Sequence, residues 1–217
     1  MRTLIFANGI FSQPENALAD IRPSDHLIAA DGGALHCLRL GIQPHIVIGD
    51  FDSLEPETLA QLEAGGAVLR RYPTRKDETD LELALFAALA EAPDEIIIYG
   101  ALGARWDMTL ANLLMLGHPA FQQASVTLVD GCQRLRLLHG GEALELHGGA
   151  GDTVSLVPLT PDTAGIHTHG LEYPLQGEAL AFGGTRGVSN VLVESPARIS
   201  LDQGLLVCIH IQNCEEP

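Results

Sequence analysis

Residues 1 to about 130 alternate between short apolar runs and longer segments with helical spacing. The apolar runs predict strands at Thr3–Ala7, His26–Ala30, Ala67–Tyr72, Glu95–Tyr99 and Ser125–Asp130, and the β-branched run that precedes Asp50 within Pro44–Leu54 predicts another. The segments between them predict helices at Ala34–Leu40, Pro56–Ala64, Thr79–Ala92 and Asp107–Leu116. Because strands that alternate with helices usually pair in parallel, this part is predicted to be an α/β domain. We expect a mainly parallel, Rossmann-like sheet in three layers, with helices on its faces.

The pattern changes after Gly131, where short strand-like runs follow one another closely and no helical period appears. They lie at Leu135–Leu138, Ala143–Leu146, Thr153–Pro158, Leu180–Phe182, Asn190–Val193, Ala197–Leu201 and Leu205–Ile211. Glycine pairs and Gly/Pro turns separate many of these runs, which is typical of an all-β sandwich or open barrel. The sequence therefore predicts two domains, residues 1–131 and residues 132–217.

The composition is that of a globular protein, with 46% hydrophobic and 18% charged residues. The net charge is −16, from 28 acidic and 12 basic residues. Unassisted nucleic-acid binding needs a basic surface, so this class of function is not expected. A phosphate-bearing small molecule would need a cation between itself and the clustered aspartates.

The cysteines, Cys37, Cys132, Cys208 and Cys214, form no CxxC pair and no zinc-like pairing with histidine. This scatter predicts a reduced, cytoplasmic protein. The apolar run at the N-terminus is too short for a signal peptide, and no stretch reaches the roughly 18–20 apolar residues that span a bilayer. No membrane partner is expected.

Two carboxylates follow the β-branched run that ends at Gly49, namely Asp50 and Asp52. Side chains two residues apart on an extended chain point the same way, so both carboxylates can converge on one point. Converging carboxylates repel each other, and a divalent cation relieves that repulsion. The alternative is a polar turn in which Asp52 and Ser53 cap the next helix.

Two further predicted strands are followed by groups of the same kind. Asp31-Gly32-Gly33 follows His26–Ala30, and its glycines let backbone amides approach a ligand closely, unless the segment is only a tight turn. Lys76-Asp77-Glu78-Thr79-Asp80 opens a predicted helix. Asp77 and Asp80 have the spacing of a capping pair, and metal ligation is an equally good interpretation.

The segment Gly100–Asp107 follows the predicted strand that ends at Tyr99. Its glycines indicate a sharp bend or a close approach, and Arg105 is a guanidinium able to grip a phosphate with two hydrogen bonds. Asp107 and Asn112 lie on the helix that follows. A plain surface pair of Arg105 and Asp107 is the alternative.

In the second domain, a polar loop runs from Gly183 to Asn190 between predicted strands. Ser189 and Asn190 offer donors and acceptors to a polar ring, although an ordinary hairpin turn also fits. We interpret His167 and His169 as surface residues and Cys208 as a core residue.

Taken in order, these groups resemble the thiamine pyrophosphokinase family. The resemblance is carried by Ala30–Gly33, Gly49–Ser53, Lys76–Asp80, Gly100–Asp107 with Asn112, Gly170–Leu175 and Gly187–Asn190. Each motif alone is weak, and the six together, in this order and spacing, are specific. The chain departs from the family pattern at Ala104, where a second glycine is usual, and at Met108, where histidine or glutamine is frequent.

The resemblance implies an α/β catalytic domain that binds ATP and Mg²⁺, and a β domain that contributes to thiamine binding and to a homodimer. In such enzymes thiamine lies between the domains, and the pyrophosphoryl group of ATP moves to its hydroxyl to give thiamine diphosphate and AMP. For this chain it implies Mg²⁺ ligation by Asp50, Asp52 and Asp77 or Asp80, with Asp50, Asp52, Asp77 and Arg105 as catalytic residues.

The remaining assignments concern the two substrates. ATP is expected to contact Asp31, Gly32, Gly33, Lys76 and Arg105. Thiamine is expected to contact Asp107, Asn112, Ser189 and Asn190.

Three alternatives remain open from the sequence. Asp50-Phe51-Asp52-Ser53 after a strand also suits a haloacid-dehalogenase-type phosphatase, although the other residues of that class are not found. Met108 keeps open a pyrophosphokinase for another ring, such as a pterin. A non-catalytic protein that senses thiamine or a nucleotide would bind the same ligands and form no AMP.

Overall fold

The computed structural model describes residues 1–214. The chain divides into two compact units, one of residues 1–131 and a second that begins at Cys132. Among the described residues, no helix is long and apolar enough to cross a membrane.

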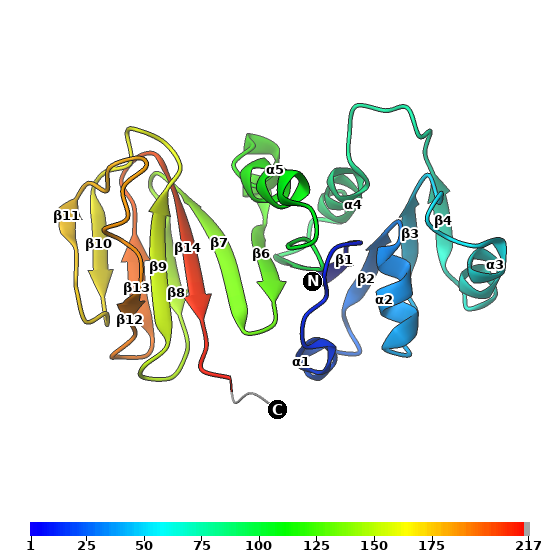
Figure 1. Cartoon of the computed structure of the whole chain (residues 1–217), viewed down its shortest axis with the longest axis horizontal. Helices are drawn as coiled ribbons and strands as arrows, with labels where there is room; N and C mark the ends of the chain where they lie inside the picture. Colours follow the sequence, from blue (N-terminus) through cyan, green and yellow to red (C-terminus); the bar gives the residue numbers. More distant parts are fainter. Residues whose placement is uncertain (215–217) are drawn as a thin grey trace. The chain divides into compact units, whose positions relative to one another are not determined.

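The first unit is built on parallel strands that lie where the sequence predicts them. They are β1 (Arg2–Phe6), β2 (His26–Ala30), β3 (Ile46–Gly49), β4 (Val68–Arg71), β5 (Glu95–Tyr99) and β6 (Ser125–Asp130), as Figure 1 shows. Their order is β6-β5-β1-β2-β3-β4, and all neighbours within this set are parallel. The chain winds outward from β1 in both directions, so β1 and β5 flank a topological switch point. In open α/β sheets ligands bind outside the carboxyl ends of the strands at such a point.

The helices of this unit are α1 (Pro14–Asp20), α2 (Gly33–Arg39), α3 (Pro56–Ala64), α4 (Asp80–Leu89) and α5 (Trp106–Met115), with a 3₁₀ turn at Pro119–Gln123. Helix α1 was not predicted. Helix α4 has a different cap from the expected one, because the Thr79 hydroxyl accepts a 3.1 Å hydrogen bond from the Glu82 amide. Thr79 thus satisfies a free N–H of the first turn. The side chain of Asp80, in the first turn, is not needed as the cap.

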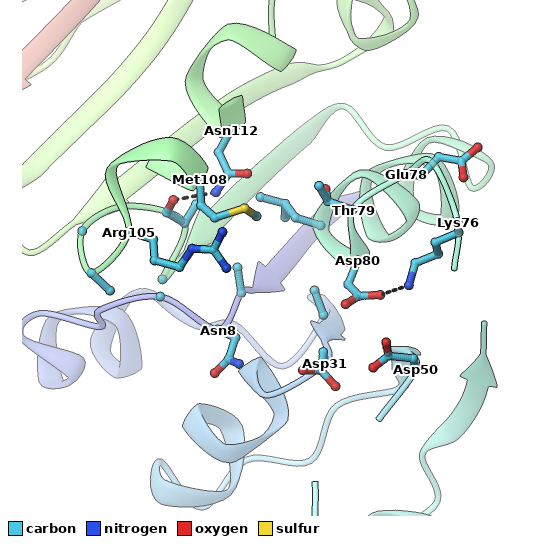
Figure 2. Close-up of a pocket in the computed structure, with 18 of the residues that line it drawn as sticks. Asn8, Asp31, Asp50, Lys76, Glu78, Thr79, Asp80, Arg105, Met108 and Asn112 are labelled. Atoms are coloured by element: carbon cyan, nitrogen blue, oxygen red, sulfur yellow. Dashed lines mark hydrogen bonds and ion pairs between the residues drawn. The ribbon is translucent and has the colours of Figure 1, made fainter. Parts of the chain in front are cut away.

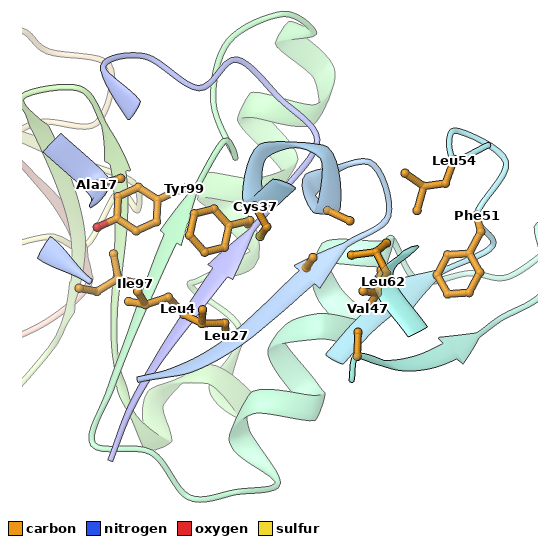
Figure 3. Close-up of a cluster of buried hydrophobic side chains, with 14 of the residues drawn as sticks. Leu4, Ala17, Leu27, Cys37, Val47, Phe51, Leu54, Leu62, Ile97 and Tyr99 are labelled. Atoms are coloured by element: carbon orange, nitrogen blue, oxygen red, sulfur yellow. The ribbon is translucent and has the colours of Figure 1, made fainter. Parts of the chain in front are cut away.

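Alternate strand residues build one core layer, shown in Figure 3. Leu4 of β1, Leu27 of β2 and Val47 of β3 are buried together with Cys37 of α2 and Leu62 of α3. Helix α4 contacts β1, β2 and β3 but contributes nothing to this cluster, so it covers the other face of the sheet. Helices on both faces explain why these strands are apolar on both sides.

Within residues 132–214 the second unit contains antiparallel strands only. They are β7 (Gln133–His139), β8 (Ala143–Leu146), β9 (Thr153–Pro158), β10 (Ile166–His169), β11 (Gln176–Glu178), β12 (Asn190–Val191), β13 (Ala197–Ser200) and β14 (Leu205–Ile211). They pair in the orders β12-β9-β14-β7 and β11-β10-β13-β8. Leucines, valines and isoleucines from both sets form one buried cluster, which gives a two-layer β arrangement.

The strand prediction at Leu180–Phe182 is wrong. Leu180 is buried, but Phe182 is largely exposed, and the run pairs with no strand of the described residues. The strand of this region is β11, which lies just upstream and consists of Gln176, Gly177 and Glu178. The prediction failed because three apolar residues before a glycine pair look like a strand whether or not a neighbouring strand pairs with them.

The expectation of four reduced cysteines is also wrong, because Cys132 and Cys214 form a disulfide with their Cα atoms 6.1 Å apart. The 82 residues between them hide this proximity in the sequence. Strands β7 and β14 are neighbours, however, and their register places Cys132 beside Gln212, whose amide donates to the Cys132 carbonyl at 3.0 Å. Cys37 and Cys208 are free and buried, and burial raises the pKa of each thiol to about 12.

Candidate active site

The loops after β1, β2, β3 and β5 border a cavity of about 420 Å³ in the first unit. Asn8 follows β1, Asp31 follows β2, Asp50 follows β3, and Arg105 lies in the loop after β5. The residues around Lys76 and the beginnings of α4 and α5 complete its lining. The cavity has the size of a small-molecule site and lies at the switch point between β1 and β5.

Two lining residues, Asp31 and Asp50, gather with the exposed Asp52, which is not itself part of the cavity lining. One carboxylate oxygen from each of Asp31, Asp50 and Asp52 lies within 4.8 Å of the other two. Asp31 is 7% exposed; its Oδ2 accepts the Ser53 hydroxyl, and its Oδ1 has no hydrogen-bond partner among residues 1–214. A buried oxygen without a donor is costly, so this arrangement suits a group that brings a positive charge.

The turn between Asp50 and Asp52 is not the extended chain that the sequence suggested. Phe51 has φ 66°, in the left-handed region, which costs roughly 1–2 kcal/mol for a residue with a Cβ. Burial of the Phe51 ring, 4% exposed, offsets this cost. The Asp52 amide donates to Asp50 Oδ1 at 3.1 Å, so the two carboxylates converge through a tight turn.

The electrostatics of Asp50 and Asp52 differ. The hydrogen bond from the Asp52 amide lowers the pKa of Asp50, and the Thr74 side chain and the charge of Lys76 act in the same direction. The charge of Asp50 raises the pKa of Asp52. The repulsion expected of converging carboxylates is therefore present, and a bound cation would relieve it.

Lys76 and Asp80 form an ion pair on the cavity wall, with Nζ 3.0 Å from Oδ1 (Figure 2). Burial raises the pKa of Asp80, while Lys76 opposes that shift. Asp77 belongs neither to the cavity lining nor to the group of three aspartates. Of the two aspartates that the sequence left open, the structure places Asp80 at the cavity.

Residues from α5 and the loop before it form the wall across from Asp31, Asp50 and Asp80, as Figure 2 shows. Arg105 lines the cavity and holds Asp107, with Nε 3.1 Å from Oδ1 and Nη2 2.6 Å from Oδ2. This contact lowers the pKa of Asp107 and raises that of Arg105. Both side chains are largely exposed, so the pair contributes little to stability and can open for a ligand.

Met108 and Asn112 lie on the same wall. The buried Asn112 amide donates to the Ala101 carbonyl at 2.7 Å and so fixes the loop before α5. Ala104 in that loop has φ 57°, a left-handed conformation that a glycine would adopt without a Cβ penalty.

The glycines at 32 and 33 are not among the residues that line the cavity. A Cβ on Gly33 would lie 1.9 Å from the Phe6 carbonyl oxygen, and one on Gly32 would lie 2.4 Å from the Asn8 side chain. At these two positions the backbone comes close to other residues of the protein, Phe6 and Asn8, and not to the cavity where a ligand was expected. Gly33 lets α2 begin directly against β1.

Ser189 and Asn190 belong to the second unit. The Asn190 side chain bonds the backbone of Tyr173 twice, with Nδ2 donating to its carbonyl at 2.8 Å and Oδ1 accepting from its amide at 3.0 Å. Ser189 has φ 62°, and its amide donates to the Ser155 hydroxyl at 3.0 Å. The polar atoms of Asn190 are thus used inside this unit.

Two polar lining residues, Asn8 and Thr74, were missed in the sequence. Asn8 follows β1 as Asp31 follows β2, so the strand-end argument applied to the first strand would have found it. Thr74 lies between β4 and Lys76 in a stretch without secondary structure, and no sequence pattern marks it.

Comparison with known proteins identifies the family. Residues 20–128 match the model of the thiamin pyrophosphokinase catalytic domain. Residues 143–206 match that of the thiamin pyrophosphokinase vitamin B1 binding domain. A thiamine pyrophosphokinase of Bacillus subtilis is 30% identical over 206 residues, which cover 93% of this chain and 96% of that protein. Thiamine pyrophosphokinase 1 of rice (Oryza sativa subsp. japonica) is 26% identical and covers 81% of this chain and 69% of its own length.

Solved structures agree with the sequence matches. The crystal structure of the thiamine pyrophosphokinase from Bacillus subtilis superposes with a TM-score of 0.87 at 26% identity, covering 99% of this chain and 100% of that one. A thiamin pyrophosphokinase family protein from Enterococcus faecalis gives a TM-score of 0.83 at 27% identity, with the same coverage. The order of motifs, both domain matches and these likenesses lead to one conclusion: the chain belongs to the thiamine pyrophosphokinase family.

Proposed function

We propose that this protein transfers the pyrophosphoryl group of ATP to the hydroxyl of thiamine, giving thiamine diphosphate and AMP. The observation that carries the proposal is the group of three aspartates, in which the buried Asp31 keeps one oxygen unpartnered among the described residues. Lys76 and Arg105 line the same cavity and supply positive charge for phosphates. Family membership supports this reaction over phosphate hydrolysis.

The donor set of Asp31, Asp50 and Asp52 fits Mg²⁺, which prefers carboxylate oxygens and phosphates. We assign Asp50 and Asp52 as ligands and Asp31 and Asp80 as the further carboxylates of the site; Asp77, which lies outside the cavity lining, is not part of it. When bound, the cation would neutralise phosphate charge and polarise the reacting phosphoryl group. The aspartates alone would repel ATP.

In the proposed reaction, the thiamine hydroxyl oxygen forms a bond to the β-phosphorus of ATP. The bond between this phosphorus and the oxygen that bridges it to the α-phosphorus breaks, and AMP leaves with the electron pair. The hydroxyl proton passes to a base. Such chemistry depends mainly on positioning and charge neutralisation. Lys76 and Arg105 would hold the phosphates in line, and the apolar lining around Ala101 and Met108 would exclude water.

For the acceptor, we propose Asp107 and Asn112 in the first unit and residues around Ser189 and Asn190 in the second. The match of residues 143–206 to a vitamin B1 binding domain supports the second unit as an acceptor-binding domain. Because the Asn190 amide is used by Tyr173, we propose that it orders the segment around Tyr173 rather than contacting thiamine itself.

We propose that the first unit, a parallel sheet with helices on both faces, is a Rossmann-like domain. We also propose that the protein is a homodimer. Helix α5 exposes a stripe of large apolar side chains at Trp106 (80% exposed), Leu110 (56%) and Leu114 (56%), one helical turn apart. A stripe of this kind is typical of a surface that another chain covers. Sedimentation of the wild type and of Leu110→Glu tests the dimer: a wild type that sediments as a monomer at micromolar concentration contradicts it.

The test of the reaction is to incubate the purified protein with ATP, Mg²⁺ and thiamine and to identify the products. AMP and thiamine diphosphate in equal amounts are expected. Free phosphate without an acceptor would indicate a phosphatase, ADP another transfer, and ligand binding without AMP a sensor. Product from a pterin-like alcohol, but none from thiamine, would indicate a different acceptor.

Asp52→Asn and Asp77→Asn form a matched pair for the metal assignment, because each removes one exposed carboxylate. Asp52→Asn is expected to lower kcat by at least about a hundredfold, since a lost metal ligand removes several kcal/mol of charge stabilisation. Asp77→Asn is expected to stay near the wild-type rate. A near-normal rate for Asp52→Asn would contradict the assignment.

A further inference from the structure

Arg71 is the last residue of β4, and the proposed reaction gives it no role. Its Nη1 donates a 2.8 Å hydrogen bond to the Asp50 carbonyl oxygen. Its guanidinium carbon lies 4.7 Å from the centroid of the Phe51 ring. One side chain thus holds two consecutive residues of the turn that presents Asp50 and Asp52.

The sheet itself places Arg71 beside this turn. Strands β3 and β4 are parallel, with Gly49 opposite Arg71, and the Tyr72 amide continues the ladder to the Gly49 carbonyl at 2.9 Å. Leu69, two residues before Arg71, packs against the core cluster that contains Phe51. Because strand side chains alternate, Arg71 lies on the same face as Phe51, and Arg70 lies on the other.

The turn needs such a support. Phe51 has a left-handed backbone that a residue with a Cβ adopts only when its surroundings enforce it. The buried ring fixes the Phe51 side chain, and the Asp52 amide fixes the Asp50 carboxylate. Arg71 adds the bond to the Asp50 carbonyl, and its planar guanidinium lies over the ring, a geometry that lysine does not reproduce.

We infer that Arg71 is a positioning residue of the metal site: it holds the turn from Asp50 to Asp52 so that both carboxylates stay within reach of Asp31. The inference rests on the proposed function, because it assumes that these aspartates bind the cation. Arg71 acts on the affinity for the metal and is not among the residues that line the cavity.

A purely electrostatic role would have the opposite effect. A positive charge near a cation site repels the cation, so removing the charge alone would strengthen metal binding. Removing a positioning contact weakens it instead, typically by about 10- to 100-fold for side chains that orient metal ligands. The sign of the change therefore distinguishes the two roles.

The experiment measures Mn²⁺ binding to the full chain without nucleotide, by electron paramagnetic resonance, for the wild type, Arg71→Gln, Arg71→Lys and Arg70→Gln. Arg71→Gln is expected to weaken Mn²⁺ binding by about tenfold. Arg71→Lys keeps the charge but loses the planar group over the Phe51 ring. It is therefore expected to weaken Mn²⁺ binding almost as much as Arg71→Gln does. Arg70→Gln removes the same charge from the opposite face of β4 and is expected to bind Mn²⁺ as the wild type does.

Enzyme activity supplies a second measurement, which distinguishes a variant with weakened metal binding from a misfolded one. Arg71→Gln is expected to need about tenfold more Mg²⁺ for half-maximal rate and to approach the wild-type kcat at saturating Mg²⁺, with an unchanged KM for thiamine. A kcat that added Mg²⁺ does not restore would overturn the inference, since a global defect gives that result.

Asp52→Asn, measured in parallel, separates this inference from the proposed function. If Asp52→Asn loses Mn²⁺ and Arg71→Gln binds it as tightly as the wild type or more tightly, the role of Arg71 is wrong and the metal site stands. If neither variant changes Mn²⁺ binding, the metal site is wrong and the inference fails with it.

Discussion

Two buried aspartates, one in each unit, differ in how their oxygens are used. Asp152 in the second unit is 3% exposed, and both of its oxygens accept hydrogen bonds within that unit. Oδ1 accepts from the Asn213 amide at 2.9 Å, while Oδ2 accepts from the Gly149 amide at 3.0 Å and lies 2.8 Å from Nε2 of the buried His210. Asp31 in the first unit is nearly as buried but has a single partner, Ser53, among the described residues.

The difference separates a structural carboxylate from one that is ready for a ligand. Folding desolvates both groups, and only Asp152 recovers the cost through donors of its own chain. A buried oxygen that lacks a donor lowers stability, and proteins keep such groups where function needs them. We therefore expect removal of the Asp152 carboxylate to lower stability and removal of the Asp31 carboxylate to lower activity.

The largest effect is expected for Asp152→Asn. The asparagine NH₂ group must face either the Asn213 amide or the donors at Gly149 and His210, so at least one donor meets another donor. We expect the free energy of unfolding to fall by about 3 kcal/mol, as when one partner of a buried pair is removed. Urea unfolding followed by circular dichroism measures it. A change below about 0.5 kcal/mol would show that Asp152 is not the anchor of this region.

The pH dependence of stability, compared between the wild type and Asp152→Asn, gives a second measurement. Burial would raise the pKa of Asp152, but the hydrogen bonds from Asn213, His210 and Gly149 outweigh it, so this pKa lies below its ordinary value in the folded protein. Because the pKa of Asp152 is lower in the folded than in the unfolded protein, its carboxylate contributes fully to stability at pH values above the unfolded-state pKa. This contribution is lost as the pH falls through the folded pKa. The stability difference between the wild type and Asp152→Asn should therefore shrink below about pH 4.

Asp31→Asn is the counterpart and is expected to have a smaller effect of the opposite kind. The neutral amide removes a buried charge, so the free energy of unfolding should stay unchanged or rise by about 1 kcal/mol. Mn²⁺ binding and kcat should each fall by about tenfold, the lower end of the range for groups near a metal. Measuring all three quantities on one preparation tests the comparison directly. A variant that loses stability but keeps its Mn²⁺ affinity would place Asp31 with Asp152 as a structural residue.

The strands of the first unit, and its helices other than α1, were predictable because they have an apolar period and end near glycine, proline or a polar cluster. The gathering of Asp31, Asp50 and Asp80 was predictable for a further reason, since parallel strands bring their carboxyl ends to one edge. The sequence could not show that Phe51 turns left-handed or that Arg71 holds it. Both depend on the register between β3 and β4, which no local pattern encodes.

The second unit was harder to predict for the same reason. Short strands such as β11 and β12 have only three and two residues, and their pairing partners decide whether they form. The disulfide between Cys132 and Cys214 depends on the register of β7 with β14. The use of the Asn190 amide by Tyr173 likewise joins residues 17 positions apart.

The smallest expected effect concerns Asn190, which extends the comparison to the proposed acceptor side. If its amide orders the backbone at Tyr173, Asn190→Ala loses both hydrogen bonds to Tyr173, of about 1 kcal/mol each. Part of this loss is expected to appear as a KM for thiamine raised about fivefold, or about 1 kcal/mol, with kcat unchanged at saturating thiamine. Steady-state kinetics with AMP formation as the readout measures both constants.

Ser189→Ala is the matched control, because it removes a neighbouring polar group and leaves the bonds between Asn190 and Tyr173 in place. A KM for thiamine that rises in Ser189→Ala and stays normal in Asn190→Ala would reverse the assignment and make the Ser189 hydroxyl the group that holds the acceptor. A rise in Asn190→Ala alone would mean that the second unit uses its polar residues as it uses Asp152, to support its own backbone. The acceptor would then be recognised by what that backbone presents, including the exposed Tyr173 side chain.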